Sequence, residues 1–208
     1  MSQARNSSIN RNRLVIIDDD NMQVYVNLAR SYEAEFSDLT HKIPNELGIF
    51  EPDTIPVFPY TGYLLYIDNI PIGFCVIGSI NEVNDVTEFY IIPSMRKNKF
   101  GYNMAVTVFD LHKGAWQVRQ IEGAASASEF WRNVIKRYTQ NIFVEAVVSD
   151  PDWGIVTRQQ FVSNAKKLTH ENQAQQNERL PELSIFGNYD DRTGHVTSSA
   201  TSSLKNPA

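Results

Sequence analysis

A short basic segment in front of a helical pattern is the part of the chain best suited to chemistry. It spans residues 96–101 and carries Arg96, Lys97 and Lys99 in an otherwise acidic chain. The first amides of a helix have no intrahelical acceptor, and the helix dipole adds partial positive charge at the same end. A helix start with cationic side chains beside it favours a phosphate or diphosphate group. A solvated basic turn is the plainer alternative that this segment leaves open.

The elements that would position this segment indicate a mixed α/β (α+β) domain. Apolar runs and alternating patterns predict strands at residues 14–17, 62–67, 72–80, 84–92, 116–121, 142–149 and 155–162. Helical spacing predicts a helix from residue 21 with a second short helix to residue 39, one over 101–112, and one behind a Ser126–Glu129 capping box. The expected order is β-α-α-β-β-β-α-β-α-β-β. Short connections make most strands antiparallel, whereas a helix crossover makes 116–121 parallel to 84–92.

Composition shifts divide the chain into three parts. We expect a polar N-terminal arm over 1–13, one domain over 14–163, and a polar, largely flexible tail over 164–208 whose only apolar patch is 180–186. Residues 41–61 hold four prolines and read as a long loop, either a lid or a structural connector. If the loop is a lid, its Phe50, Phe58 and Tyr60 would wall a pocket, and Glu51 or Asp53 would attract a cation.

Composition also limits the function classes. The chain has 208 residues and a net charge of −5, which argues against nucleic acid and anionic membranes as partners. It has no apolar run long enough for a membrane span, and its four histidines lack metal-ligand spacing, so we expect no metal site. The single cysteine, Cys75, excludes an intramolecular disulfide and suits a cytoplasmic protein.

Two motifs, together with the order of elements, resemble the GNAT superfamily of N-acetyltransferases. The coenzyme A signature of that family is Arg/Gln-x-x-Gly-x-Gly/Ala at a helix start after the fourth strand, and residues 96–101 match it after a strand ending at Pro93. A second pattern, Asn-x-x-Ala-x-x-Phe-Tyr, matches residues 124–131. The sequence departs from these patterns at Lys99, which replaces a glycine, and at Ala124 and Trp131, which stand where the family often has Asn and Tyr.

The resemblance implies a mostly antiparallel sheet flanked by helices and direct transfer of an acetyl group from acetyl-CoA to a primary amine of a small molecule or peptide. Backbone amides near Phe89 and Ile91 would hold the pantetheine arm and polarise the thioester carbonyl, and amides from Lys97 to Asn103 would hold the pyrophosphate. The coenzyme-binding residues so implied are Phe89, Ile91, Arg96, Lys97, Asn98, Lys99, Phe100, Gly101, Tyr102 and Asn103. A homodimer is expected by analogy with the family.

Two side chains are candidates for acid–base chemistry. Glu88 is the candidate base that takes the proton of the amine; the alternative is a strand carboxylate that faces solvent or forms a salt bridge. Tyr138 is the candidate acid, because the indole of Trp131 cannot protonate a thiolate; a buried core tyrosine is its plainer interpretation. The altered motif positions keep a second function open, a degenerate GNAT-like module that binds acyl-CoA or a protein partner without turnover.

Overall fold

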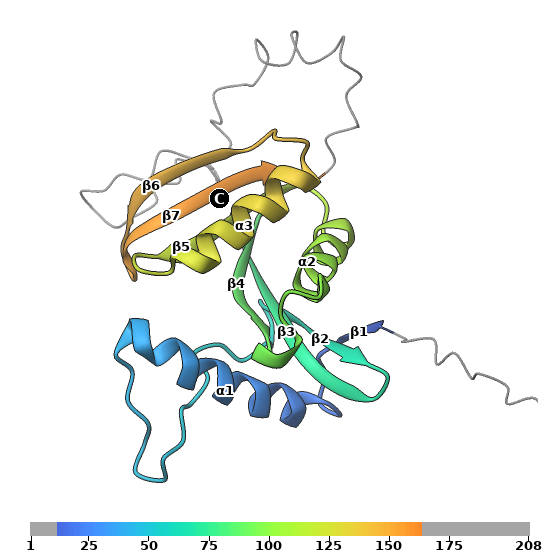
Figure 1. Ribbon diagram of the computed structural model, residues 1–208, viewed down its shortest axis with the longest axis vertical. Coiled ribbons are helices and arrows are strands. Elements are labelled where there is room, and N and C mark those ends of the chain that lie inside the picture. Colours follow the sequence, from blue (N-terminus) through green and yellow to red (C-terminus); the bar gives the residue numbers. More distant parts are fainter. Residues whose placement is uncertain (1–11, 164–208) are drawn as a thin grey trace, which may run out of the picture. The chain divides into compact units, whose positions relative to one another are not determined.

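The computed structural model describes residues 12–163, which form a seven-stranded sheet with three α-helices (Figure 1). The strands lie in the order β1-β2-β3-β4-β5-β7-β6, and only the β4–β5 pair is parallel. The elements are β1 (Asn12–Ile16), α1 (Met22–Thr40), β2 (Thr61–Ile67), β3 (Ile70–Ile80), β4 (Val83–Ile91), the short 3₁₀ helix η1 (Pro93–Met95), α2 (Phe100–Leu111), β5 (Ala115–Ile121), α3 (Ala125–Tyr138), β6 (Val144–Asp150) and β7 (Gly154–Val162). The expected fold class, a mixed and mostly antiparallel sheet flanked by helices, is confirmed.

Three expectations about the elements are wrong. One helix, not two, follows β1, because residues 22–40 contain no glycine or proline that would end it. The expected capping box does not form, since α3 already begins at Ala125 and Ser126 lies inside it. The first strand begins at Asn12, two residues earlier than expected. Residues 1–11 and the expected tail 164–208, with its apolar patch, lie outside the described residues.

The sheet buries a separate apolar cluster on each face. On one face, Tyr25 and Ala29 of α1 pack against Phe74 and Tyr90 of the central strands. On the other face lies the larger cluster, to which α2 and α3 contribute and which includes Trp116 of β5. Because successive strand residues point to opposite faces, β2, β3 and β4 supply residues to both clusters. The two layers of helices therefore enclose the sheet, with α3 running along β5 and β7 (Figure 1).

The parallel pair β4–β5 separates partway along its length. Residues Val83–Val86 pair with Ala115–Val118, but β4 continues to Ile91 and β5 to Ile121 without further pairing between them. Beyond Val86 the edge of β4 that faces β5 therefore has no strand partner within the described chain. We call this unpaired stretch, residues 87–91 of β4 and 119–121 of β5, the wedge.

A β-bulge in β4 reorients its side chains at the start of this wedge. Val86 lies opposite Ile77 of β3 but Glu88 lies opposite Val76, so Thr87 is an extra residue. Val86 consequently belongs to the cluster under α2 and α3, whereas Glu88 turns toward the α1 side. Simple alternation over residues 84–92 predicts Val86 and Glu88 on one face of the strand, which is wrong because the bulge at Thr87 separates them.

Candidate active site

Two lysines of the loop between η1 and α2 have a left-handed backbone conformation. Lys99, at the glycine position of the motif, is the N-cap of α2 with φ 64°, and Lys97 also has φ 64°. This left-handed conformation costs a non-glycine residue roughly 1–2 kcal/mol, and glycine adopts it freely. Lys99 therefore keeps the turn that a glycine would make, and adds an exposed ammonium group to it.

The first turn of α2 offers backbone donors to an anion. Within residues 12–163, the amides of Phe100, Gly101 and Tyr102 precede the first intrahelical bond and have no acceptor. The amide of Asn103 differs, because it donates to the carbonyl of Lys99 at 2.9 Å. The residues present thus fit a diphosphate at the start of α2, with Asn103 excluded as a backbone donor.

Arg96 is not free to bind phosphate in this structure. Its Nε donates to the carbonyl of Ile91 at 2.8 Å, and its two terminal nitrogens donate to the carboxylate of Glu35 on α1 at 2.7 and 2.8 Å. The guanidinium also lies over the ring of Tyr90, 5.6 Å from its centroid. Arg96 therefore ties the end of β4 to α1, a role that its place in the motif did not indicate.

Aromatic side chains fill the space between β4 and the two helices. Phe89 contacts Trp131 edge-on at 4.8 Å between ring centroids and Phe130 at 5.6 Å. A Cβ added at Gly101 would lie 3.2 Å from Phe130 and 3.5 Å from Phe89, so this glycine permits the close approach of α2 to α3. Trp131 is 5% exposed and serves packing at the position where the family often has a tyrosine.

Tyr138 lies apart from the other candidate residues. Its hydroxyl donates to Asp110 Oδ1 at 2.9 Å near the C-terminal end of α2, about 14 Å along that helix from Gly101. Its ring packs on Phe109, on the α2–α3 side of the sheet. Burial and the neighbouring Asp110 raise the pKa of Tyr138 and make it a weaker acid. The structure does not bring Tyr138 together with Glu88.

Glu88 is a buried carboxyl that titrates near neutral pH. Its side chain is on β4, within the wedge, and it accepts a hydrogen bond from Thr54 Oγ1 at 3.0 Å. Burial raises the pKa of Glu88 to about 7, the bond from Thr54 opposes this rise, and the carboxylates of Glu33 and Asp53 add to it. A carboxyl with this pKa is half ionised at neutral pH, which is what a general base requires.

The loop between α1 and β2 is fastened over Glu88 by one lysine. Lys42 Nζ donates to Glu33 Oε2 at 2.9 Å, to Asp53 Oδ1 at 2.6 Å and to the carbonyl of Glu51 at 2.6 Å. Glu33, only 3% exposed, also accepts the amide of Asp53. These bonds hold the segment that presents Thr54 to Glu88. Sequence reasoning missed this set, because residues 34 positions apart leave no local pattern.

Two of the three aromatic side chains of the same loop are exposed to solvent. Phe58 is 97% exposed and Tyr60 is 39% exposed. The acidic pair that was expected to attract a cation is already engaged, Asp53 with Lys42 and Glu51 with Arg30 at 3.6 Å. These ion pairs therefore hold the loop in place over the part of β4 that carries Glu88.

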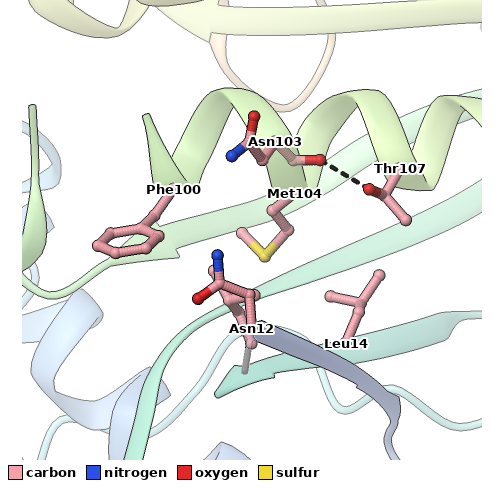
Figure 2. A pocket seen from close by; sticks show the side chains of 7 residues that line it. Asn12, Leu14, Phe100, Asn103, Met104 and Thr107 are labelled. Carbon is pink, nitrogen blue, oxygen red and sulfur yellow. Dashed lines mark hydrogen bonds between the residues drawn. The ribbon is translucent and has the colours of Figure 1, made fainter. Parts of the chain in front are cut away.

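A shallow hollow of about 180 Å³ lies between α2 and β1 (Figure 2). In Figure 2 the side chain of Met104 points from α2 toward Asn12 of β1. Its lining residues are Asn12, Leu14, Leu65, Phe100, Asn103, Met104 and Thr107. The hollow borders the first turn of α2 but includes neither Glu88 nor the wedge.

Solved structures with the same fold include N-acetyltransferases. A chimera of the spermidine N-acetyltransferase SpeG from Vibrio cholerae and hSSAT matches with a TM-score of 0.51 and 11% identity over 73% of this chain and 95% of that chain. The PaiA N-acetyltransferase of Thermoplasma acidophilum, solved in complex with coenzyme A, matches with a TM-score of 0.50 and 10% identity over 73% of this chain and 99% of that chain. No protein-family model and no curated protein matches the sequence. The chain thus has the GNAT fold, as its motifs indicated.

Two further observations concern metals and membranes. Among residues 12–163, no group of three His, Cys, Asp or Glu side chains is arranged to hold a metal ion. The helices in this range include none that is both long and apolar enough to cross a bilayer.

The raised pKa of Glu88 predicts a pH-dependent stability. The folded state holds the proton of Glu88 up to about pH 7, whereas the unfolded chain releases it near the ordinary value of 4.5. The stabilising contribution is therefore complete below pH 4.5 and is lost as pH rises through 7. Between pH 5 and 8, the free energy of unfolding of the wild type should fall by about 2–3 kcal/mol relative to that of Glu88→Gln. Urea unfolding at both pH values measures this difference.

The exposed Glu82 provides a control for this measurement. Glu82→Gln should follow the wild type at every pH, since Glu82 lies at the surface in the β3–β4 turn. A wild type and a Glu88→Gln variant whose stabilities run parallel from pH 5 to 8 would contradict a raised pKa at Glu88.

Proposed function

We propose that this chain is an N-acetyltransferase that transfers the acetyl group of acetyl-CoA to a primary amine of a small molecule or peptide. The observation that carries the proposal is Glu88, a buried carboxyl with a pKa of about 7 on β4 in the wedge between β4 and β5. The GNAT fold supports the same reaction class, since PaiA with this fold was solved in complex with coenzyme A.

Binding of acetyl-CoA would use the start of α2 and the open edge of β4. The free amides of Phe100, Gly101 and Tyr102, with the exposed Lys97 and Lys99 nearby, suit the diphosphate. The edge of β4 beyond Val86 has no strand partner in the described chain, so backbone amides near Phe89 and Ile91 remain the candidates to hold the pantetheine arm.

Transfer would then proceed in one displacement. The acceptor arrives as an ammonium ion, and Glu88 accepts its proton, directly or through a water molecule. The freed amine nitrogen attacks the thioester carbonyl carbon, a C–N bond forms, the C–S bond breaks, and the nitrogen releases its second proton to water as it becomes the amide. Backbone amides of β4 stabilise the oxygen that becomes negative during the attack. The coenzyme leaves as a thiolate that takes a proton from solvent, since Tyr138 lies elsewhere.

The charges near Glu88 favour a cationic acceptor. Three carboxyl groups, those of Glu33, Asp53 and Glu88, act on one another on this side of the sheet, and Lys42 balances only part of their charge. An ammonium group entering beside Glu88 would lower the cost of ionising that carboxyl.

Two contacts favour a second candidate function, a GNAT-like module that binds acyl-CoA or a protein partner without turnover. Phe130 packs directly on Gly101 at the start of α2, and Arg96 is held by Glu35. Both contacts narrow the access of a ligand to the coenzyme motif. An enzyme and a binding module would both bind acetyl-CoA, but only the enzyme releases free thiol when amines are added.

Calorimetric titration with acetyl-CoA tests the binding step. Charge reversal in the Lys97→Glu/Lys99→Glu variant should weaken binding by roughly 10–100-fold, because two exposed cations near the diphosphate are replaced by anions. The matched control is Lys113→Glu, an exposed lysine beyond the opposite end of α2, which should bind like the wild type. Gly101→Glu is unsuitable, because its side chain would collide with Phe130.

Each outcome of this titration has a defined meaning. A wild type that does not bind acetyl-CoA would overturn the proposed function. Equal affinity of the wild type and the double variant for acetyl-CoA would show that the diphosphate does not bind at the start of α2. Binding without thiol release across a panel of primary amines would favour the module that lacks turnover.

A further inference from the structure

The side-chain amide of Gln120 on β5 is buried without a partner. Gln120 is 4% exposed, and within residues 12–163 neither its Oε1 nor its Nε2 makes a hydrogen bond. Buried amides are nearly always paired, because an unpaired donor or acceptor loses its hydration with no compensation. An amide left unpaired on both atoms indicates that something other than the described chain satisfies it.

Gln120 lies on the wall of the wedge between β4 and β5. Trp116, Val118 and Gln120 alternate as the buried residues of β5, and the first two belong to the cluster under α2 and α3. Gln120 therefore faces the same side of the sheet. Pairing with β4 ends at Val118, so Gln120 is the first residue on this face beyond the paired part of β5. Phe89 of β4 lies on the same face.

The chemistry of Gln120 indicates its ligand. A primary amide offers N–H donors and a carbonyl acceptor, and a secondary amide matches both kinds of group. The coenzyme has secondary amides only in its pantetheine arm. With the diphosphate at the start of α2 and the thioester near Glu88, this arm would pass through the wedge. We infer that Gln120 binds an amide of the pantetheine arm, an assignment that rests on the proposed function and adds a side chain to the backbone contacts proposed above.

A neighbouring glutamine, also buried, differs from Gln120 because its amide nitrogen has a hydrogen-bond partner within the chain. Gln159 of β7 lies opposite Val118 and is 0% exposed, and its Nε2 donates to Glu145 Oε2 at 2.8 Å, whereas its Oε1 has no partner within residues 12–163. The described chain therefore supplies a partner for the Nε2 of Gln159 and for neither polar atom of the Gln120 side chain. This difference makes Gln159 a matched control.

The test compares Gln120→Met with Gln159→Met in the full chain. Methionine keeps the length of the side chain and removes the amide. In Gln120→Met, the affinity for acetyl-CoA should fall about tenfold, with unchanged affinity for adenosine 3′-phosphate 5′-diphosphate, which lacks the arm. The urea midpoint of the ligand-free protein should rise, because an unpaired buried amide has been removed. Gln159→Met should bind both ligands normally and show no rise in its midpoint.

The two readouts separate the ways in which the inference would fail. Unchanged acetyl-CoA affinity in Gln120→Met, with a lower midpoint, would mean that an internal water satisfies the amide and would overturn the inference alone. An equal loss of affinity for both ligands would also overturn it, since the effect would then arise at the phosphate end. A wild type that binds the adenosine ligand and acetyl-CoA equally weakly would overturn the proposed function together with the inference.

Discussion

Replacement of Glu88 by glutamine is expected to lower kcat/KM for amine acetylation by about 10²–10⁴-fold. Glutamine has the shape of the carboxyl and can still accept the hydrogen bond from Thr54, but it cannot take a proton. Because Glu88 faces the α1 side and the diphosphate would lie at the start of α2, the affinity for acetyl-CoA should remain within about twofold of the wild type. Initial rates of thiol release and a calorimetric titration measure the two quantities.

The pH profile gives this prediction a second readout. Glu88 acts in its ionised form, so kcat/KM of the wild type should rise with pH through about 7, the pKa of the buried carboxyl. In Glu88→Gln, kcat/KM should no longer rise with pH through 7. Glu82→Gln should keep both the wild-type rate and this rise. A Glu88→Gln variant within threefold of the wild-type rate at pH 7.5 would remove Glu88 from the mechanism.

Truncation of Trp131 to alanine is expected to destabilise the fold by about 3–5 kcal/mol. Trp131 is 5% exposed and lies among Phe89, Phe130 and Phe109, with centroid distances of 4.8, 5.1 and 6.2 Å. Its removal would leave a cavity where α3 meets the sheet, at the wall of the wedge. Urea unfolding at one pH measures the change in the free energy of unfolding.

Trp153 supplies the same substitution in a different environment. It lies in the β6–β7 turn and is 45% exposed, so Trp153→Ala should cost under about 1 kcal/mol. Similar losses for the two tryptophans would show that Trp131 is not a packing residue. If so, its place at the family's tyrosine position would require another explanation.

The sequence predicted most of the fold because the signals were local. Alternation and short turns gave the antiparallel strands, and the helix between β4 and β5 required the parallel pair. The second short helix was predicted wrongly, since α1 continues through polar positions where the periodic pattern weakens. The bulge at Thr87 left no signal of its own, yet it decides which face Glu88 occupies.

The candidate site was predictable only in part. The start of α2 was located because its motif lies within six consecutive residues, 96–101. The partners of the motif residues were not predicted from the sequence, since Arg96 is paired with Glu35, 61 positions earlier. Glu88 was selected as one carboxyl on a strand, but its raised pKa depends on Thr54, Glu33 and Asp53, which only the folded loop brings near. Tyr138 was selected by helical repeat, and its contact with Asp110 is a tertiary one.

The ion pair between Glu35 and Arg96 couples the position of α1 to the binding of an anion at the loop between η1 and α2. A guanidinium can satisfy a carboxylate or a phosphate in the same bidentate way, so the two compete for it. Thermodynamic linkage makes such competition reciprocal: whatever a phosphate gains from Arg96, α1 loses in its attachment to the end of β4. The helix that carries Tyr25, Tyr32 and Glu33 over Glu88 would then be loosened by occupation of the opposite side of the sheet. One ion pair would in this way connect the two faces of the molecule.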